Sequence, residues 1–192
     1  MYYINKEYQN TLEIKKSKFI THICQYKDFK TTMNRLKDEY PKARHFVYAY
    51  RYLNEFDQIV ENSSDDGEPK GTSGRPSLNV LSGGDIINSA VIIVRYFGGI
   101  RLGTGGLVKA YSDAVNLVLN NSNLIEYKKL IRKSLIVSYS NLSLVEYTIS
   151  LFSVNIIEKL FENDVKLILE ASKEEFVLLQ EKLIRECELI DE

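Results

Sequence analysis

Apolar residues in the first 127 positions follow two kinds of spacing. The segment Lys27–Tyr40 carries them at helical spacing, and Pro41 cannot continue a helix. Leu107–Leu119 forms a wide apolar stripe opposite polar positions, which predicts a helix packed on a sheet. Short runs rich in β-branched and aromatic residues predict strands. These strands are Thr11–Ile14, Lys18–Cys24, His45–Tyr52, Phe56–Glu61 and Ala90–Val94.

Turn residues organise the centre of this region. Residues 54–55 separate two of the strands and predict a hairpin. From Asn62 to Gly84, apolar residues give way to Asn, Ser, Asp, Gly and Pro, which predicts a long loop. Leu78, Val80 and Leu81 interrupt this composition and could form a short strand.

A second pattern begins after Tyr127. Two capping boxes, Ser143 to Glu146 and Ser172 to Glu175, predict the starts of its helices. The order βαββαβ predicts a ferredoxin-like sandwich, so we expect an α+β protein with domains at 1–127 and 128–192. The expected elements are strand Leu130–Val137, helix Leu144–Phe152, strand Val154–Leu160, strand Val165–Leu169, helix Lys173–Arg185 and a candidate closing strand at Glu188–Ile190.

Composition and charge do not by themselves select a partner. The 192 residues are 44% hydrophobic and 27% charged, which is typical of globular domains, and the formal net charge is -1. Residues 1–127 hold 16 Lys and Arg against 14 Asp and Glu, a charge of +2, and residues 128–192 hold 9 against 12, a charge of -3. Any site for anions is therefore local, and the first domain is the better place for it.

The sequence favours a cytoplasmic protein. Its N-terminus lacks the apolar core of an export signal, and no run of about 18 apolar residues predicts a membrane span. Cys24 and Cys187 match no metal or redox spacing, and they fit buried thiols in a reducing compartment.

The segment Arg95–Tyr111 carries the strongest signal for binding chemistry. It reads as a buried strand, a glycine-rich turn and a helix start, where backbone N–H groups and close approach suit an anion. The spacing of its glycines matches neither a Rossmann nor a P-loop motif, so no nucleotide cofactor is expected. A purely structural strand-to-helix connection is the alternative. The candidate residues are Arg95, Tyr96, Phe97, Gly98, Gly99, Arg101, Gly103, Gly105, Gly106 and Lys109, in which the arginines and the lysine supply charge and the two aromatic rings could stack a base.

The polar loop Ser63–Pro76 offers a second candidate. Asp65, Asp66 and Glu68 could present oxygens to Mg²⁺, although a solvated acidic turn explains the same residues. Lys70 and Arg75 make the loop a mixed-charge surface.

Histidine chemistry receives less support. No Ser, Cys or Thr is marked as a nucleophile for His45 to activate, so a structural or hydrogen-bonding role fits it better. His22 lies in an apolar strand and is expected to be structural.

Three ordered blocks resemble the signatures of the IMPACT/YigZ family. They are ARHFVYAYR at Ala43–Arg51, SDDGEPKGTSGRP at Ser64–Pro76 and VRYFGGIRLGTGGLVKAYSDAV at Val94–Val115. The resemblance implies a first domain similar to the ribosomal protein S5 domain 2-like fold. It implies a second domain similar to a late domain of elongation factor G.

The resemblance also implies a link to translation and nucleic acid. It places this link on residues of the matching blocks, which are Arg44, His45, Asp66, Glu68, Arg75, Arg95, Tyr96, Arg101 and Lys109. The leading hypothesis is a regulatory protein that binds RNA, the ribosome or a translation factor, with no cofactor and no membrane contact. The alternatives are a metal-dependent enzyme acting on a phosphate-containing or nucleic-acid substrate, with Asp65, Asp66 and Glu68 at its metal, and a protein-interaction module. The sequence does not define the oligomeric state.

Overall fold

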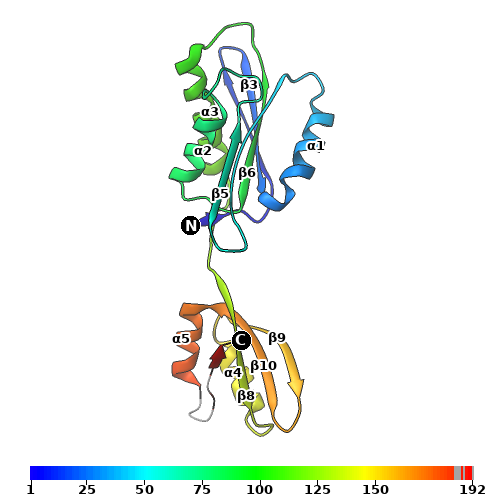
Figure 1. Cartoon of the computed structure of the whole chain (residues 1–192), viewed down its shortest axis with the longest axis vertical. Coiled ribbons are helices and arrows are strands. Elements are labelled where there is room, and N and C mark those ends of the chain that lie inside the picture. The colour runs from blue at the N-terminus through cyan, green and yellow to red at the C-terminus, as the bar shows by residue number, and fades with distance from the viewer. Residues whose placement is uncertain (184–186, 188, 192) are drawn as a thin grey trace. The chain divides into compact units, whose positions relative to one another are not determined.

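The structure is a computed structural model, and it describes residues 1–183, 187 and 189–191. The chain divides into two units, Met1–Tyr127 and Lys128–Glu192, and each unit has its own buried core. Figure 1 shows the elements of both units.

The first unit is built on a five-stranded antiparallel sheet with the order β2-β3-β6-β4-β5. Its strands are β2 (Tyr8–Ile14), β3 (Ser17–Gln25), β4 (His45–Leu53), β5 (Ile59–Ser64) and β6 (Ser89–Tyr96). A separate pair joins β1 (Tyr2–Tyr3) to β7 (Ile125–Glu126). The predicted hairpin is confirmed, because β4 and β5 pair across the turn at residues 54–58.

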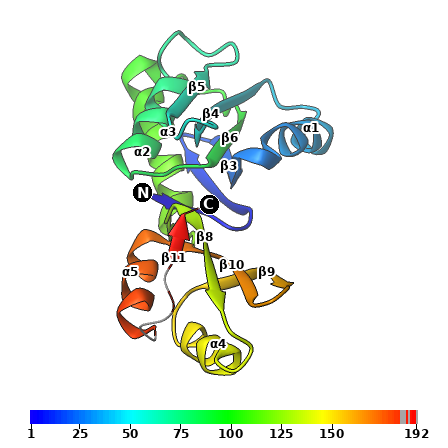
Figure 2. The ribbon, with the colours of Figure 1, turned by 60° about the horizontal axis from the view of Figure 1, so that its bottom comes forward.

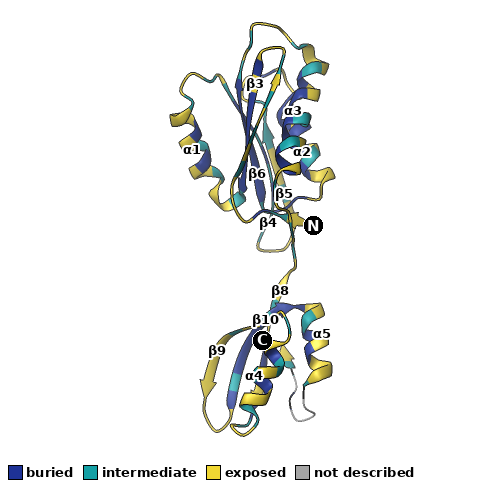
Figure 3. Ribbon diagram, turned by 180° about the vertical axis from the view of Figure 1, so that it is seen from behind, coloured by how far each residue is buried: buried dark blue, intermediate teal, exposed yellow. Residues whose placement is uncertain are grey.

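Helices cover both faces of this sheet. Helix α1 (Phe29–Glu39), which follows the 3-10 turn η1 (Tyr26–Asp28), lies on one face, and α2 (Gly74–Gly83) and α3 (Gly103–Asn120) lie on the other (Figures 1 and 3). Strand β6 is therefore buried on both faces: Ile92 packs on the side of Leu36, and Ile93 packs on the side of Tyr111. This confirms the strand predicted from the continuous apolar run.

The prediction of a short strand at Leu78, Val80 and Leu81 is wrong, because these residues belong to α2. Leu78 and Leu81 are three residues apart and reach the same core, which is a helical spacing. Pro76 is tolerated because it lies in the first turn, where its missing N–H breaks no helical hydrogen bond. The loop is thus confined to residues 65–73.

Helix α3 begins at Gly103, four residues before the predicted apolar stripe. Gly103, Gly105 and Gly106 therefore form the first turn of the helix and are not part of the preceding turn. Periodicity missed this turn because glycines carry no side chain to mark a buried face.

The second unit has the βαββαβ order that its pattern predicts. Its strands form an antiparallel sheet in the order β11-β8-β10-β9, and both helices pack against one face, with Leu135 and Leu169 of the sheet in the same core (Figure 2). Arg185 and Glu188, which the predictions included, lie outside the described residues. The elements are β8 (Leu130–Val137), α4 (Leu142–Ser150), β9 (Asn155–Phe161), β10 (Val165–Ser172), α5 (Lys173–Lys182) and β11 (Leu189–Asp191).

One of the two predicted caps is present. The Ser172 hydroxyl accepts a hydrogen bond from the Glu175 N–H at 3.3 Å and caps α5. The cap predicted at Ser143 is wrong, because α4 begins at Leu142 and places Ser143 inside its first turn. Glu146 instead forms an ion pair with Lys159 of β9 at 2.7 Å.

The sequence also predicts buried cysteines and no membrane-spanning segment. Cys24 and Cys187 are both buried, and neither forms a disulfide with another described residue. Across the described ranges, no helix is long and apolar enough to cross a membrane.

His22 is a buried titratable group next to the core of the first unit. Its Nδ1 donates to the Glu7 carboxylate at 2.7 Å, and Arg35 binds the same carboxylate at 2.6 Å. Burial lowers the pKa of His22 from its ordinary value of 6.5, although Glu7 acts in the opposite direction. The unfolded chain therefore binds a proton more readily at this position than the folded protein does.

We predict that His22 makes the folded state less stable as the pH falls below 6.5, because protonation then favours the unfolded chain. His22→Gln keeps an N–H donor for Glu7 and cannot gain this charge. Urea unfolding from pH 7.5 to 5.0 should show a smaller loss of unfolding free energy in the variant than in the wild type. Parallel losses in the two proteins would contradict the prediction.

Candidate functional site

The loop between β5 and α2 is held by the side chain of Asp65. Its carboxylate accepts hydrogen bonds from the Gly71 N–H at 2.7 Å, the Gly74 N–H at 2.8 Å and the Ser73 hydroxyl at 2.7 Å. Burial acts to raise the pKa of Asp65, but these donors outweigh it and lower the pKa below its ordinary value. Asp65 thus closes the loop and caps the start of α2.

Asp66 and His45 attach the same loop to β4. The Asp66 carboxylate accepts from the Phe46 N–H at 2.6 Å, and the His45 Nδ1 donates to the Asp66 carbonyl at 2.7 Å. The second bond fixes the proton of His45 on Nδ1, because a carbonyl oxygen only accepts. His45 therefore has the hydrogen-bonding role that its sequence context favours.

The side chain of Glu68 extends from the loop into the interior of the unit. Its carboxylate accepts from the Arg95 guanidinium of β6 and from the Tyr111 hydroxyl of α3, the latter at 2.8 Å, and all three side chains are buried. Burial, followed by the Glu68 charge, raises the pKa of Tyr111 well above its ordinary range. The guanidinium also lies 5.4 Å from the ring centre of Phe19 and 5.8 Å from that of Phe97.

The three acidic residues of the loop point to different partners. Asp65 faces backbone N–H groups, Asp66 faces β4, and Glu68 faces Arg95 and Tyr111. Within the described part of the chain, no three His, Cys, Asp or Glu side chains are grouped as metal ligands. The residues expected to hold Mg²⁺ in the enzyme hypothesis therefore do not converge.

The glycine-rich connection from β6 to α3 lies against the β2–β3 turn. A Cβ on Gly98 would lie 2.0 Å from the carbonyl carbon of Lys16, so only glycine allows this approach. The Gly98 N–H also donates to the Ser17 hydroxyl at 3.1 Å. Gly99 has a φ of 84° and faces open space.

The start of α3 is open to solvent. Gly103, Thr104 and Gly105 are exposed, and the N-cap residue, Leu102, supplies no side-chain hydrogen bond to the first turn. The first N–H groups of a helix have no partner within the helix and carry its positive dipole end. This end of α3 is therefore available to an anion.

Exposed cations lie at the same end of the sheet as this helix start. Lys15 and Lys16 form the β2–β3 turn with φ values of 46° and 65°, and Lys18 pairs in register with Tyr96 at the end of β6. Arg44 precedes His45, which pairs with Arg95 at the same end of the sheet. We call Lys15, Lys16, Lys18, Arg44 and Arg101, together with the first turn of α3, the basic end.

These five side chains are exposed, and none forms an ion pair with a residue that the structure describes. The sequence patterns did not predict Lys15, Lys16 and Lys18 as candidate anion-binding residues. Their clustering in the run KKSK is the local signal that could have indicated them.

The other predicted residues differ in their availability. Arg75 is exposed in the first turn of α2, and Tyr96 is half-buried. Lys109 is exposed but forms an ion pair with Asp113 at 2.7 Å. Arg95 is 6% exposed and faces Glu68, so in this conformation it stabilises the interior and presents no free charge at the surface.

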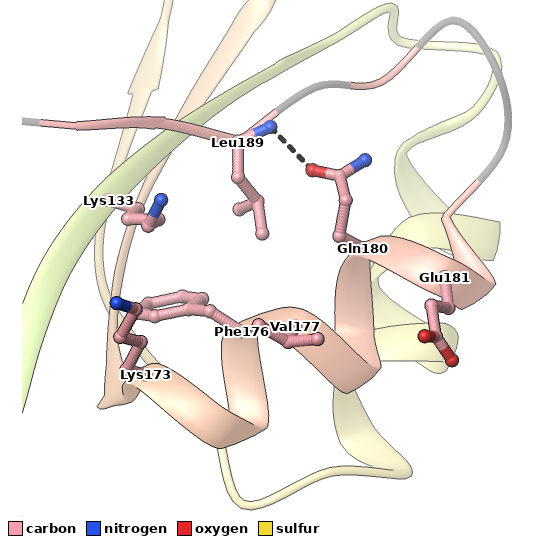
Figure 4. A pocket seen from close by; sticks show the side chains of 7 residues that line it. All are labelled: Lys133, Lys173, Phe176, Val177, Gln180, Glu181 and Leu189. Atoms are coloured by element: carbon pink, nitrogen blue, oxygen red, sulfur yellow. Dashed lines mark hydrogen bonds between the residues drawn. The ribbon is translucent and has the colours of Figure 1, made fainter.

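The second unit contains a separate pocket of about 360 Å³ between α5, β8 and β11 (Figure 4). Phe176, Val177 and Leu189 supply apolar walls, and Gln180 accepts a hydrogen bond from the Leu189 N–H at 3.0 Å. Lys133, at the pocket, forms an ion pair with Asp191 at 2.8 Å. None of the residues predicted to bind anions lies here.

Comparisons with known proteins agree with the resemblance of the sequence blocks. The family model described as the Impact N-terminal domain matches residues 15–119. A Haemophilus influenzae protein named IMPACT family member is 37% identical over 167 residues, which cover 84% of this chain and 80% of that protein. Escherichia coli YigZ, also named an IMPACT family member, is 44% identical over 110 residues, or 56% of this chain and 54% of YigZ.

A solved structure extends the likeness to both units. The crystal structure of a hypothetical protein aligns with 100% of this chain and 96% of its own chain, at 30% identity and a TM-score of 0.67.

We predict that Glu68→Ala lowers the free energy of unfolding by about 3–5 kcal/mol, because it leaves the buried Arg95 charge without its partner. Urea unfolding measures this loss. The matched control is Asp113→Ala, which breaks the exposed pair with Lys109 and should cost less than about 1 kcal/mol. Equal costs for the two variants would show that Glu68 does not hold a buried ion pair.

Gly98 in the connection and Gly105 in the first turn of α3 should respond differently to alanine. Gly98→Ala places a Cβ against the backbone of Lys16 and should destabilise the protein by about 1–3 kcal/mol. Gly105→Ala adds a Cβ in open space within a helix and should be neutral, or stabilising by up to about 1 kcal/mol. Thermal unfolding of both variants tests the close approach of Gly98 to the Lys16 backbone. An unchanged melting temperature for Gly98→Ala would contradict it.

Proposed function

We propose that this chain, which belongs to the IMPACT family, is a cytoplasmic, translation-associated regulatory protein whose first unit binds RNA, either free or within the ribosome. Phosphate groups would lie at the basic end. The family resemblance supports the link to translation, and the geometry of the basic end supports the choice of an anionic ligand.

One observation carries the proposal: an uncapped helix start lies beside cations that have no described ion-pair partner. The packing of Gly98 on Lys16 brings the β2–β3 turn next to the connection that leads into α3. Backbone N–H groups and exposed lysine and arginine side chains are the groups that bind nucleic-acid phosphates.

The neighbouring loop adds negative charge near this surface, of which the Glu68 charge is balanced by Arg95. Asp65, Asp66 and Glu68 each accept hydrogen bonds from the protein itself. Glu13 of β2 is an exposed acid near Lys15 and Lys16. Because it adds one negative charge against two positive charges, the turn keeps a net positive charge. Phe97 and Ile100, which are 56% and 45% exposed, add apolar contact surface to the same connection.

We also propose the finer fold assignments that accompany this function. The strand order β11-β8-β10-β9 within a βαββαβ chain supports a ferredoxin-like second unit. The sheet with α1 on one face and α2 and α3 on the other supports the ribosomal protein S5 domain 2-like fold for the first unit.

A charge-removal experiment tests the proposal. Lys15→Gln/Lys16→Gln/Arg101→Gln removes three charges from the basic end, and Lys128→Gln/Lys173→Gln/Lys182→Gln removes three exposed charges from the second unit as a control. Binding to purified ribosomes and to single-stranded RNA is followed by co-sedimentation over a salt series. We expect the basic-end variant to reduce the slope of log affinity against log salt by about 2, because each lost phosphate contact removes about 0.7.

The control variant should keep the wild-type slope. A basic-end variant with an unchanged slope and affinity would contradict the assignment of the site. Absence of binding to both ribosomes and RNA by the wild-type protein would contradict the proposed function itself.

A further inference from the structure

Three tyrosines of β4 lie in a row on the face of the first sheet that also carries α1. Tyr48, Tyr50 and Tyr52 alternate along β4, so their side chains lie on one face, and we call them the tyrosine ladder. On the opposite face, α2 packs over β4 and β5. On the face of the ladder, α1 packs over β3 and β6, and its first residue, Phe29, reaches the rings of Tyr48 and Tyr50.

The rings of the ladder are ordered by their neighbours. Tyr48 and Tyr50 are nearly parallel, with an angle of 4° and centroids 6.0 Å apart. Tyr26 stacks on Tyr52 at 3.9 Å, and Phe29 of α1 lies 5.1 Å from Tyr48. Four other rings lie 5.0–6.0 Å from that of Tyr50. All three tyrosines are half-buried, so each residue remains partly accessible.

The neighbouring strand adds polar groups without charge. Ser64, Asn62 and Val60 of β5 pair in register with the three tyrosines and share their face. The Asn62 amide donates to the Tyr50 hydroxyl at 3.3 Å. The charged Glu61 points to the other face, where it pairs with Arg51. The open surface is thus aromatic and able to form hydrogen bonds.

Cations border the ladder along α1. One side of α1 carries Arg35 and Glu39 and faces β2, since Arg35 contacts both Glu39 and Glu7, which directly precedes β2. The helical period of 3.6 residues places Lys30 and Lys37 on the opposite flank, which faces β4 and β5. Both lysines are exposed.

Acidic residues lie at both ends of the ladder. Glu55 and Asp57 lie in the β4–β5 turn, beyond the Tyr52 end, and Asp28 lies in η1 beside Lys27. The Tyr48 end leads to His45 and Arg44 and therefore toward the basic end. The exposed carboxylate of Asp66, which accepts from the Phe46 N–H, also lies at this end, so the cations that border the ladder itself are Lys30 and Lys37.

We propose that the tyrosine ladder is a stacking platform for the bases of single-stranded RNA, whose phosphates contact Lys30 and Lys37. This inference extends the proposed function and depends on it. Aromatic side chains beside a basic groove are the general means of binding single strands, because every base has a π face. A duplex keeps its bases stacked inside the helix and cannot use the platform.

Charge complementarity favours RNA over a proline-rich peptide, which is the other ligand that aromatic grooves bind. A neutral peptide would gain nothing from Lys30, Lys37 and Arg44. An RNA strand can use both the rings and the cations.

The test compares two fluorescein-labelled RNA 12-mers by fluorescence anisotropy, one of uridines and one abasic with the same number of phosphates. Tyr48→Leu/Tyr50→Leu removes two rings and keeps apolar volume, whereas Tyr48→Phe/Tyr50→Phe keeps the rings. Tyr139→Leu/Tyr147→Leu, at two exposed tyrosines of the second unit, is the matched control.

We expect the uridine 12-mer to bind the Leu variant roughly 5- to 150-fold more weakly than the wild type, the range known for loss of a stacked base. The Phe variant and the control should bind like the wild type. The abasic strand should bind the wild type weakly and should not distinguish it from the Leu variant.

The remaining outcomes separate the two proposals. If uridine and abasic strands bind equally and the Leu variant binds like the wild type, the platform is wrong while phosphate binding at the basic end stands. If the wild type binds neither strand, both proposals fail. Ladder-dependent binding of decaproline without binding of RNA would assign the surface to peptides and overturn the platform.

Discussion

The buried carboxylate of Glu68 is the contact on which the first unit depends. It accepts hydrogen bonds from Arg95 of β6 and Tyr111 of α3, and it belongs to a loop that has no regular structure of its own. A buried charge is tolerated only with close partners. The ion pair with Arg95 joins the loop to the central strand β6, and the hydrogen bond from Tyr111 joins it to α3.

The position of the candidate site follows from this arrangement. Asp65 and Asp66 close the loop onto α2 and β4 through hydrogen bonds, and Asp66 remains exposed. Gly98 brings the connection after β6 against the β2–β3 turn, which leaves Lys15 and Lys16 beside the open start of α3. The Glu68 charge is thus paired inside the unit, and Lys15 and Lys16 remain on the surface at the same end of the sheet.

Most strands and helices could be predicted from the sequence because apolar spacing records which face is buried. The same signal failed at α2, where a helix follows directly after a turn-rich loop and a tertiary contact from Asp65 caps it. Sequence patterns located the glycine-rich connection and Arg101. They could not show that Arg95 is paired with Glu68 or that Lys15 and Lys16 approach Gly98, because both contacts join segments far apart in the chain.

The central claim is that RNA phosphates bind at the start of α3 and at the β2–β3 turn. The most direct measurement is a titration of the ¹⁵N-labelled protein with single-stranded RNA, followed by the backbone amide resonances. We predict the largest shifts at Gly99, Gly103 and Gly105 and at Lys15 and Lys16, with smaller shifts along β4. Shifts confined to the second unit, or spread evenly over the surface, would contradict it.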